Sequence, residues 1–151
     1  MYDEIYEAVM KKFSEGRTFS LATVRNGKPT VRTMSGFSLK GKIYFQTDSL
    51  MDKAIDIKNN NQVALCLDEI QIQGNCAEVG HPYDKSNSWF VDIFKAFFPK
   101  AYAQYSHIET ERVYEITPLW VKIWEKHEGV PSLVCLDIEN KKHEIKLFEE
   151  Y

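Results

Sequence analysis

Alternating apolar and polar positions dominate the first half of the chain and predict a β-sheet. The pair Asn26-Gly27 is a strong hairpin signal, because a type I′ turn needs positive φ at both central positions. A second turn at residues 39–42 leads into the next alternating run, so we expect a three-stranded antiparallel meander there. The expected strands are residues 17–24, 30–37, 43–47, 63–67, 70–79 and 111–125.

Two other stretches follow helical spacing instead. Residues 2–13 place their apolar side chains on one face, and Gly16 is a plausible stop. Residues 86–98 carry a wide aromatic stripe that ends near Pro99. Such a stripe fits a helix packed in the core, and it also fits a helix that meets a second subunit or walls a ligand cleft.

A third helix is expected just after Asp48-Ser49, with Ser49 as its N-cap. The first amide groups of a helix have no intrahelical partners, so a helix start suits an anion such as phosphate. Lys53 lies one turn inside this helix, and Arg32 on the preceding strand could add a fork-shaped donor. The same residues also fit an ordinary capped helix with a solvated lysine.

The composition fits one globular domain and narrows the chemistry. The chain has 151 residues, 44% hydrophobic and 27% charged, with a net charge of −3. We therefore expect no general affinity for nucleic acid or membrane, and the acidic, amphipathic N-terminus favours cytoplasmic residence. The cysteines and histidines are scattered without metal-ligand spacing, so no metal site or disulfide framework is expected. These residues are Cys66, Cys76, Cys135, His81, His107, His127 and His143.

An ordered set of motifs resembles the pyridoxamine 5′-phosphate oxidase-like family of FMN-binding split β-barrels. The resemblance covers residues 1–125 and leaves residues 126–151 as a C-terminal β extension of the same domain. The motifs are Pro29-x-x-Arg32, Ile43-Tyr44-Phe45-Gln46-Thr47, Asp48-Ser49, Lys53-Ala54, Asn59-Asn60-Asn61-Gln62-Val63-Ala64-Leu65, Gly74 and Ala77-Glu78-Val79.

The resemblance implies a mainly β (α+β) fold. It is a six-stranded antiparallel split β-barrel of Greek-key connectivity with flanking α-helices. It also implies a homodimer with two FMN sites at the interface. Arg32, Ser49 and Lys53 would hold the FMN phosphate and ribityl chain. Relatives carry a basic residue where this chain has Asp52.

The same resemblance places further residues around the flavin. Thr33, Met34 and Ser35 would run along the ring, and Gln46 and Thr47 would contribute from the next strand. Gln71 would reach the flavin, with Glu69 and Gln73 as alternatives in register. Trp124, or else Trp120, would touch the ring of the partner subunit's flavin.

We therefore expect an FMN-dependent oxidoreductase acting on a small molecule, with no catalytic triad. In pyridoxamine phosphate oxidase an Arg-x-His element follows the C-terminal Trp, and Lys126-His127-Glu128 stands there instead. A nitro-compound or quinone-type reductase fits equally well. The alternative is a non-catalytic FMN carrier or redox-responsive binding protein. A more remote alternative is a pocket for heme or a deazaflavin, and the substrate and electron donor stay open.

Overall fold

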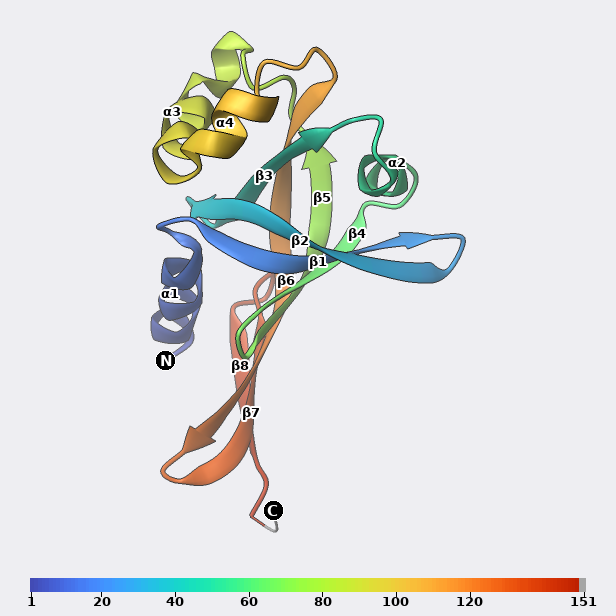
Figure 1. Cartoon of the computed structure of the whole chain (residues 1–151). Coiled ribbons are helices and arrows are strands. Elements are labelled where there is room, and N and C mark those ends of the chain that lie inside the picture. The colour runs from blue at the N-terminus through green and yellow to red at the C-terminus, as the bar shows by residue number, and fades with distance from the viewer. Residues whose placement is uncertain (150–151) are drawn as a thin grey trace.

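The computed structural model describes residues 1–149, and antiparallel strands make up about half of it (Figure 1). The strands follow the order β3-β2-β1-β4-β5-β6-β7-β8, and an additional β3–β6 pairing closes the first six into a ring. The expected six-stranded barrel is thus confirmed. The strands are β1 (Arg17–Arg25), β2 (Lys28–Leu39), β3 (Lys42–Asp48), β4 (Gln62–Leu67), β5 (Ile70–Glu78), β6 (Glu111–His127), β7 (Val130–Asp137) and β8 (Lys142–Leu147).

Helices flank the ring at separate places (Figure 1). The N-terminal helix packs on β2, the short helix after β3 packs on β1 and β5, and a helical pair lies together beyond β5. They are α1 (Tyr2–Phe13), α2 (Asp52–Asn59), the 3₁₀ turn η1 (Lys85–Asn87), α3 (Ser88–Phe97) and α4 (Pro99–Tyr105). None of the helices within residues 1–149 combines the length and apolarity needed to cross a membrane.

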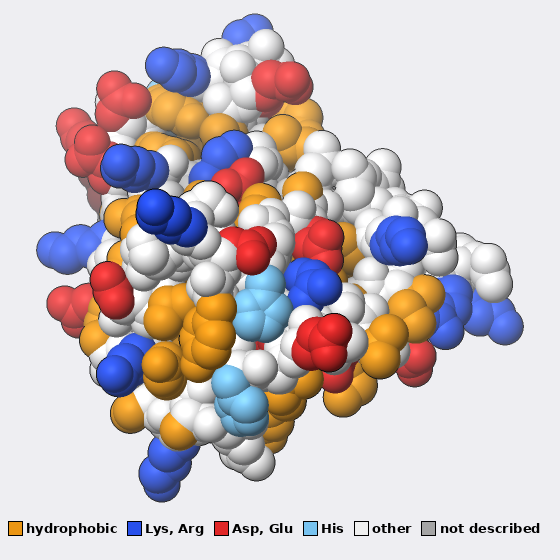
Figure 2. Space-filling model, turned by 90° about the horizontal axis from the view of Figure 1, so that it is seen from above, with side chains coloured by type: hydrophobic (Ala, Val, Ile, Leu, Met, Phe, Trp, Pro, Cys, Tyr) orange, Lys and Arg blue, Asp and Glu red, His pale blue; other side chains and the backbone are white. Residues whose placement is uncertain are grey.

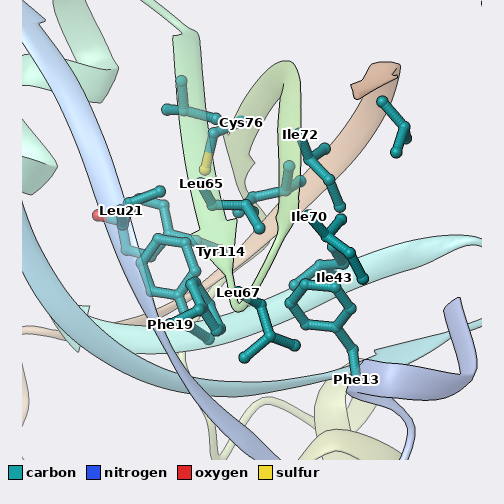
Figure 3. Close-up of a cluster of buried hydrophobic side chains, with 14 of the residues drawn as sticks. Phe13, Phe19, Leu21, Ile43, Leu65, Leu67, Ile70, Ile72, Cys76 and Tyr114 are labelled. Carbon is teal, nitrogen blue, oxygen red and sulfur yellow. The ribbon is translucent and has the colours of Figure 1, made fainter. Parts of the chain in front are cut away.

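The main core fills the interior of the ring and extends under α1 and α2. Phe13 of α1 and Phe19 of β1 meet edge to face with ring centroids 5.9 Å apart, and aliphatic side chains from β3, β4 and β5 surround them (Figure 3). These positions alternate along each strand, because successive side chains of a strand point to opposite faces. The alternation in the sequence therefore predicted which face is buried.

A second, smaller core lies under α3 and buries part of the aromatic stripe that the sequence shows on this helix. Phe90 and Phe94 are buried there against Phe37, Tyr44 and Val113. Phe90 stacks on Phe37 with ring centroids 5.4 Å apart. Phe90 and Phe94 of the stripe are thus core, Trp89 and Ile93 pack against it, and Phe97 is 37% exposed.

The C-terminal segment continues the barrel sheet. β6 runs without a break beyond residue 125, and β7 and β8 pair onto it in a long extension that leaves the ring (Figure 1). The segment therefore shares a strand with the barrel, and its assignment to the same domain stays a prediction.

Candidate anion-binding corner between β2 and α2

Arg32 is held in place by hydroxyl and carbonyl groups on two strands. It pairs with the buried Leu21 on β1, so its stem lies on the inner face of the sheet. Nη1 donates to Thr23 Oγ1 at 2.7 Å and to the Leu21 carbonyl oxygen at 3.3 Å. Nη2 donates to Thr30 Oγ1 at 2.6 Å. The side chain is thus oriented by three acceptors.

These contacts leave one edge of the Arg32 guanidinium open. A guanidinium carries five N–H donors, and the three hydrogen bonds use both hydrogens of Nη1 and one of Nη2. Within residues 1–149 no hydrogen bond engages Nε–H or the second Nη2 hydrogen of Arg32. Those two donors form the fork that binds a phosphate or carboxylate through two parallel hydrogen bonds.

Lys53, in the first turn of α2, brings a second cation to the same corner. The side chain is half-buried, and this burial is the main reason why the pKa of its ammonium group is lowered. The Arg32 cation lowers that pKa further. Asp48, Asp52 and Glu111 act in the opposite direction. Two like charges close enough to perturb each other form a site that an anion would stabilise.

The start of α2 differs from the sequence expectation. The helix begins at Asp52 with Met51 as its N-cap and without a side-chain cap, so the expectation that Ser49 caps the helix is wrong. The reason is a long-range contact: the Ser49 amide and hydroxyl both donate to the Thr110 carbonyl oxygen at 2.8 Å. Its hydroxyl hydrogen is therefore already used, whereas in residues 1–149 no hydrogen bond engages the amides of Asp52 and Lys53.

A buried carboxyl group lies behind Lys53. Glu111, at the start of β6, is 4% exposed and accepts a hydrogen bond from Gln46 Nε2 at 2.9 Å. Burial, and then the Asp48 carboxylate, raise the pKa of Glu111 to about 7, although Gln46 and Lys53 oppose the change. This corner therefore holds cations at its surface and a protonatable acid beneath them.

Gln46 and Thr47 are both buried, which limits what their side chains can contact. Gln46 donates to Glu111 and accepts from the Ser106 hydroxyl at 2.9 Å, so both ends of its amide are engaged. A role for Gln46 toward a ligand would therefore fall to its backbone, and both residues stay predictions as flavin contacts.

The other predicted residues spread over both faces of the sheet. Thr33 and Gln71 lie in one lateral row on the outer face, joined through Ser20 and Cys66. Ser35 shares that outer face, whereas Met34 pairs with Phe19 and packs against the main core. The structure thus brings Arg32 and Lys53 together and places Thr33 and Gln71 in a row on the opposite face of the sheet.

Trp124 lies far from this corner within one protomer. Arg112 pairs with Thr47 beside the corner, and Trp124 is 12 residues further along the same strand. At about 3.3 Å per residue this is roughly 40 Å of strand. Trp124 instead lines a groove of about 430 Å³ between α1 and the β5–β6 region, and its ring also contacts that of Phe148. It could therefore reach a ligand at the corner only from another copy of the chain.

Sequence reasoning missed several residues that build the corner, namely Thr23, Thr30, Asp56, Ser106 and Glu111. The usable signal was the alternation of β1, since Thr23 continues the inward-facing series of Phe19 and Leu21 and therefore had to be a buried polar group. Asp56 gave a similar signal as an acid between the buried Ala54 and Ile57. No local pattern pointed to Glu111 or Ser106.

Viewed from above, the surface carries cations and anions interspersed, without one dominant sign (Figure 2). Local geometry, rather than a broad positive field, therefore has to provide the affinity of the corner for an anion.

Comparisons with solved structures find the same fold in other proteins. One is a pyridoxamine 5′-phosphate oxidase-related, FMN-binding protein from Nostoc punctiforme, with 15% identity over 97% of this chain and 92% of that one, and a TM-score of 0.59. Another is PhzG from Burkholderia lata in complex with tetrahydrophenazine-1-carboxylic acid, with 14% identity over 97% and 89% and a TM-score of 0.63. A third is the heme storage protein HutZ from Vibrio cholerae, with 16% identity over 77% and 88% and a TM-score of 0.61.

Sequence comparison gives the family. Among curated proteins no sequence matches this chain. The family model described as pyridoxamine 5′-phosphate oxidase matches residues 5–125, which include β1 to β5 and all of β6 except its last two residues. With most of its length matched and the split-barrel fold in place, this chain belongs to the pyridoxamine 5′-phosphate oxidase family.

Proposed function

We propose that this protein is an FMN-binding flavoprotein that acts as an oxidoreductase on a small molecule. In this proposal the Arg32 and Lys53 side chains bind the phosphate of the cofactor, and the free backbone amides at the start of α2 donate further hydrogen bonds to it. Thr33, Met34, Ser35, Thr47, Ser49 and Gln71 are further proposed contacts of the cofactor. Thr33, Ser35 and Gln71 lie on the opposite face of the sheet from Arg32, so in this proposal they contact a part of the cofactor other than the phosphate.

The observation that carries the proposal is the pairing of two cations at the corner. Arg32 presents an unused two-donor edge, and Lys53 lies near enough for its pKa to be lowered by the Arg32 charge. Placing two cations together costs free energy unless an anion joins them, and a phosphate dianion matches both the charge and the fork geometry.

The residues of the corner fit FMN by the chemistry of their donors. When bound, FMN supplies the electron transfer itself, and the protein binds and orients it. Arg32 and Lys53 would hold the phosphate, and the backbone of β2 and β3 would contact the ring system. The inward position of Met34 supports contact through the backbone rather than through its side chain.

A homodimer with the flavin at its interface is part of the proposal. The outer face of the ring carries a row of residues in register, and all but Gln73 are small or apolar: Val31, Ala22, Ala64, Gln73 and Trp120. Val31 is 67% exposed and Trp120 is 49% exposed. Exposed apolar side chains gathered on one face favour association. In this proposal the Trp124 that contacts the flavin belongs to the second copy.

The test is the loss of phosphate-dependent binding when the cations are removed. For Arg32→Ala and Lys53→Ala we expect roughly 10- to 100-fold weaker FMN binding each, because charge-assisted hydrogen bonds contribute about 1.5–3 kcal/mol. Riboflavin, which lacks the phosphate, should bind all variants with similar affinity. The measurement is flavin absorbance and fluorescence titration, with mass measurement of any cofactor released from the purified protein.

Lys85→Ala is the matched control, since Lys85 is an exposed lysine in η1 and is not among the residues proposed to bind FMN. It should leave FMN affinity unchanged. If a folded Arg32→Ala/Lys53→Ala protein bound FMN as tightly as the unmodified chain, these residues would not form the site.

A non-catalytic FMN carrier is the second candidate, and one observation favours keeping it. Among the described residues, every buried side-chain nitrogen or oxygen has a hydrogen-bond partner, so no orphaned polar group marks a substrate contact. Consumption of NAD(P)H with an electron acceptor separates an enzyme from a carrier. The absorption spectrum of the purified protein separates flavin from heme or deazaflavin.

A further inference from the structure

Asp56 is a buried acid beside the anion-binding corner that the proposed function leaves unexplained. It lies on α2, 3% exposed, and accepts a hydrogen bond from Arg25 Nε at 2.6 Å. Its other oxygen accepts from the Thr23 hydroxyl at 2.8 Å. Burial raises the pKa of Asp56, but the hydrogen bonds from Thr23 and Arg25 outweigh it and the pKa is lowered. Asp56 is thus an ionised, acceptor-only group.

Thr23 connects this carboxylate to Arg32 with a defined hydrogen-bond direction. Its hydroxyl, in a fully buried residue, has one hydrogen, and a carboxylate can only accept. The hydrogen of Thr23 therefore points to Asp56, and a lone pair faces Arg32 Nη1 at 2.7 Å. With Thr30 on Nη2, the end of the guanidinium is held by two hydroxyl groups 3.4 Å apart.

We propose that Asp56 is a positioning residue for Arg32: acting through Thr23, it holds the guanidinium with its Nε–Nη2 edge open before a phosphate arrives. The inference rests on the proposed function, because it assigns a role to the residue proposed to bind the FMN phosphate. Arg25 pairs with Asp56 directly, whereas Arg32 is joined to Asp56 through Thr23.

Holding the Arg32 side chain in its binding conformation before the phosphate arrives should increase the affinity for the phosphate. A free arginine side chain populates many rotamers, and fixing one of them on binding costs affinity. Here the hydrogen bonds from Thr23 to Asp56 and from Arg32 to Thr23 fix the Arg32 rotamer when the protein folds, so the entropy loss does not reduce the affinity for the ligand. The network joins α2 to β1 and β2, so the same helix carries Lys53 and the anchor for Arg32.

The central test is a double-mutant cycle on FMN binding. Thr23→Val keeps the shape of the side chain and removes the hydroxyl, and we expect FMN to bind about tenfold more weakly with riboflavin affinity unchanged. Thr23→Ser should restore the affinity. In an Arg32→Ala background Thr23→Val should have no further effect, because a residue that acts through Arg32 has nothing left to position. Thr18→Val, an exposed position on the same strand, is the control.

A second measurement does not depend on FMN. In the ligand-free protein, NMR signals of the Arg32 guanidinium should show hindered rotation that is lost in Thr23→Val and in Asp56→Asn. If Thr23→Val does not fold, Thr30→Val at an exposed position removes the other hydroxyl contact and should weaken FMN binding in the same way.

The outcomes separate the two proposals. If the unmodified chain binds FMN and the Thr23 and Thr30 variants bind it equally well, the positioning role is overturned and the proposed function stands. An ordered Arg32 in a protein that binds no FMN would overturn the proposed function. A Thr23→Val effect that persists in full without Arg32 would mean that Thr23 acts on the fold, which also overturns the positioning role.

Discussion

Glu111 shows how one side chain links the stability of this protein to pH. It is buried, it donates no hydrogen bond within residues 1–149, and its pKa is raised to about 7 from a usual value near 4.5. Between these two pH values the folded chain binds more protons than the unfolded chain. Stability must therefore fall as pH rises through this window, because ionising a buried acid costs free energy.

Glu111→Gln should remove that pH dependence. The variant keeps the size and the polarity of the side chain but does not titrate, so its stability relative to the unmodified protein should improve by about 1–3 kcal/mol between pH 5 and pH 8. Thermal unfolding at constant ionic strength measures the difference. Glu109→Gln, at an exposed position, is the control. Parallel pH profiles for Glu111→Gln and the unmodified protein would contradict the assignment.

At the scale of the element, a bulge decides which face of β6 each tryptophan occupies. The β5–β6 register shifts between Gln73 and Gly74, where Gly74 faces Pro118 and Gln73 faces Trp120. The extra residue, Leu119, changes the phase of the strand, so buried positions move from Ile116 and Pro118 to Val121. Without this bulge, Trp120 would point into the core.

Gly74→Ala should destabilise the barrel at this bulge. A Cβ at Gly74 would overlap the Thr117 carbonyl oxygen, and neither backbone can yield without breaking the pairing of the two strands. We expect a loss of at least about 2 kcal/mol in the free energy of unfolding, measured by chemical denaturation. Asn75→Ala, on the exposed face of the same strand, should be nearly neutral. Equal stability of the two variants would show that the close approach is relieved elsewhere.

At the scale of the whole molecule, the outer face of the ring is the surface proposed for self-association. Grooves of about 480 Å³ and 320 Å³ lie on it, and Ala22, Ala64 and Gln73 line both of them. Val31 and Trp120 protrude from this face, and the small residues Ala22 and Ala64 between them form a depression. A second copy of the chain could pack into this surface.

Trp120→Glu should therefore shift the protein from dimer to monomer, because it places a charge in the centre of a proposed apolar contact. Sedimentation equilibrium measures the mass, and FMN titration should show weaker binding in the monomer if the site is shared. Tyr105→Glu, at an exposed position on α4, is the control. A Trp120→Glu protein with unchanged mass would place the interface on another face.

Local patterns were enough to predict the six barrel strands and the helices α1, α2 and α3, but not α4, which begins at Pro99, where the aromatic stripe was expected to end. Alternation identified each barrel strand because a strand buries every second side chain, and Asn26-Gly27 identified the first hairpin because few residues adopt positive φ. The motif set around Arg32 and Lys53 led to the family, which the comparison confirmed. These features depend on neighbours along the chain, so the sequence alone determined them.

Tertiary structure decided everything that depends on distant partners. Ser49 loses its role as a cap because Thr110, 61 positions away, accepts its hydrogen bonds. Glu111 meets Gln46 across 65 positions, and Asp56 reaches Thr23 across 33. The hydrogen-bond direction at Arg32 and the pKa of Glu111 arise from these contacts. They arise only when the ring closes, because a hydrogen bond or a desolvated charge depends on what surrounds it in space.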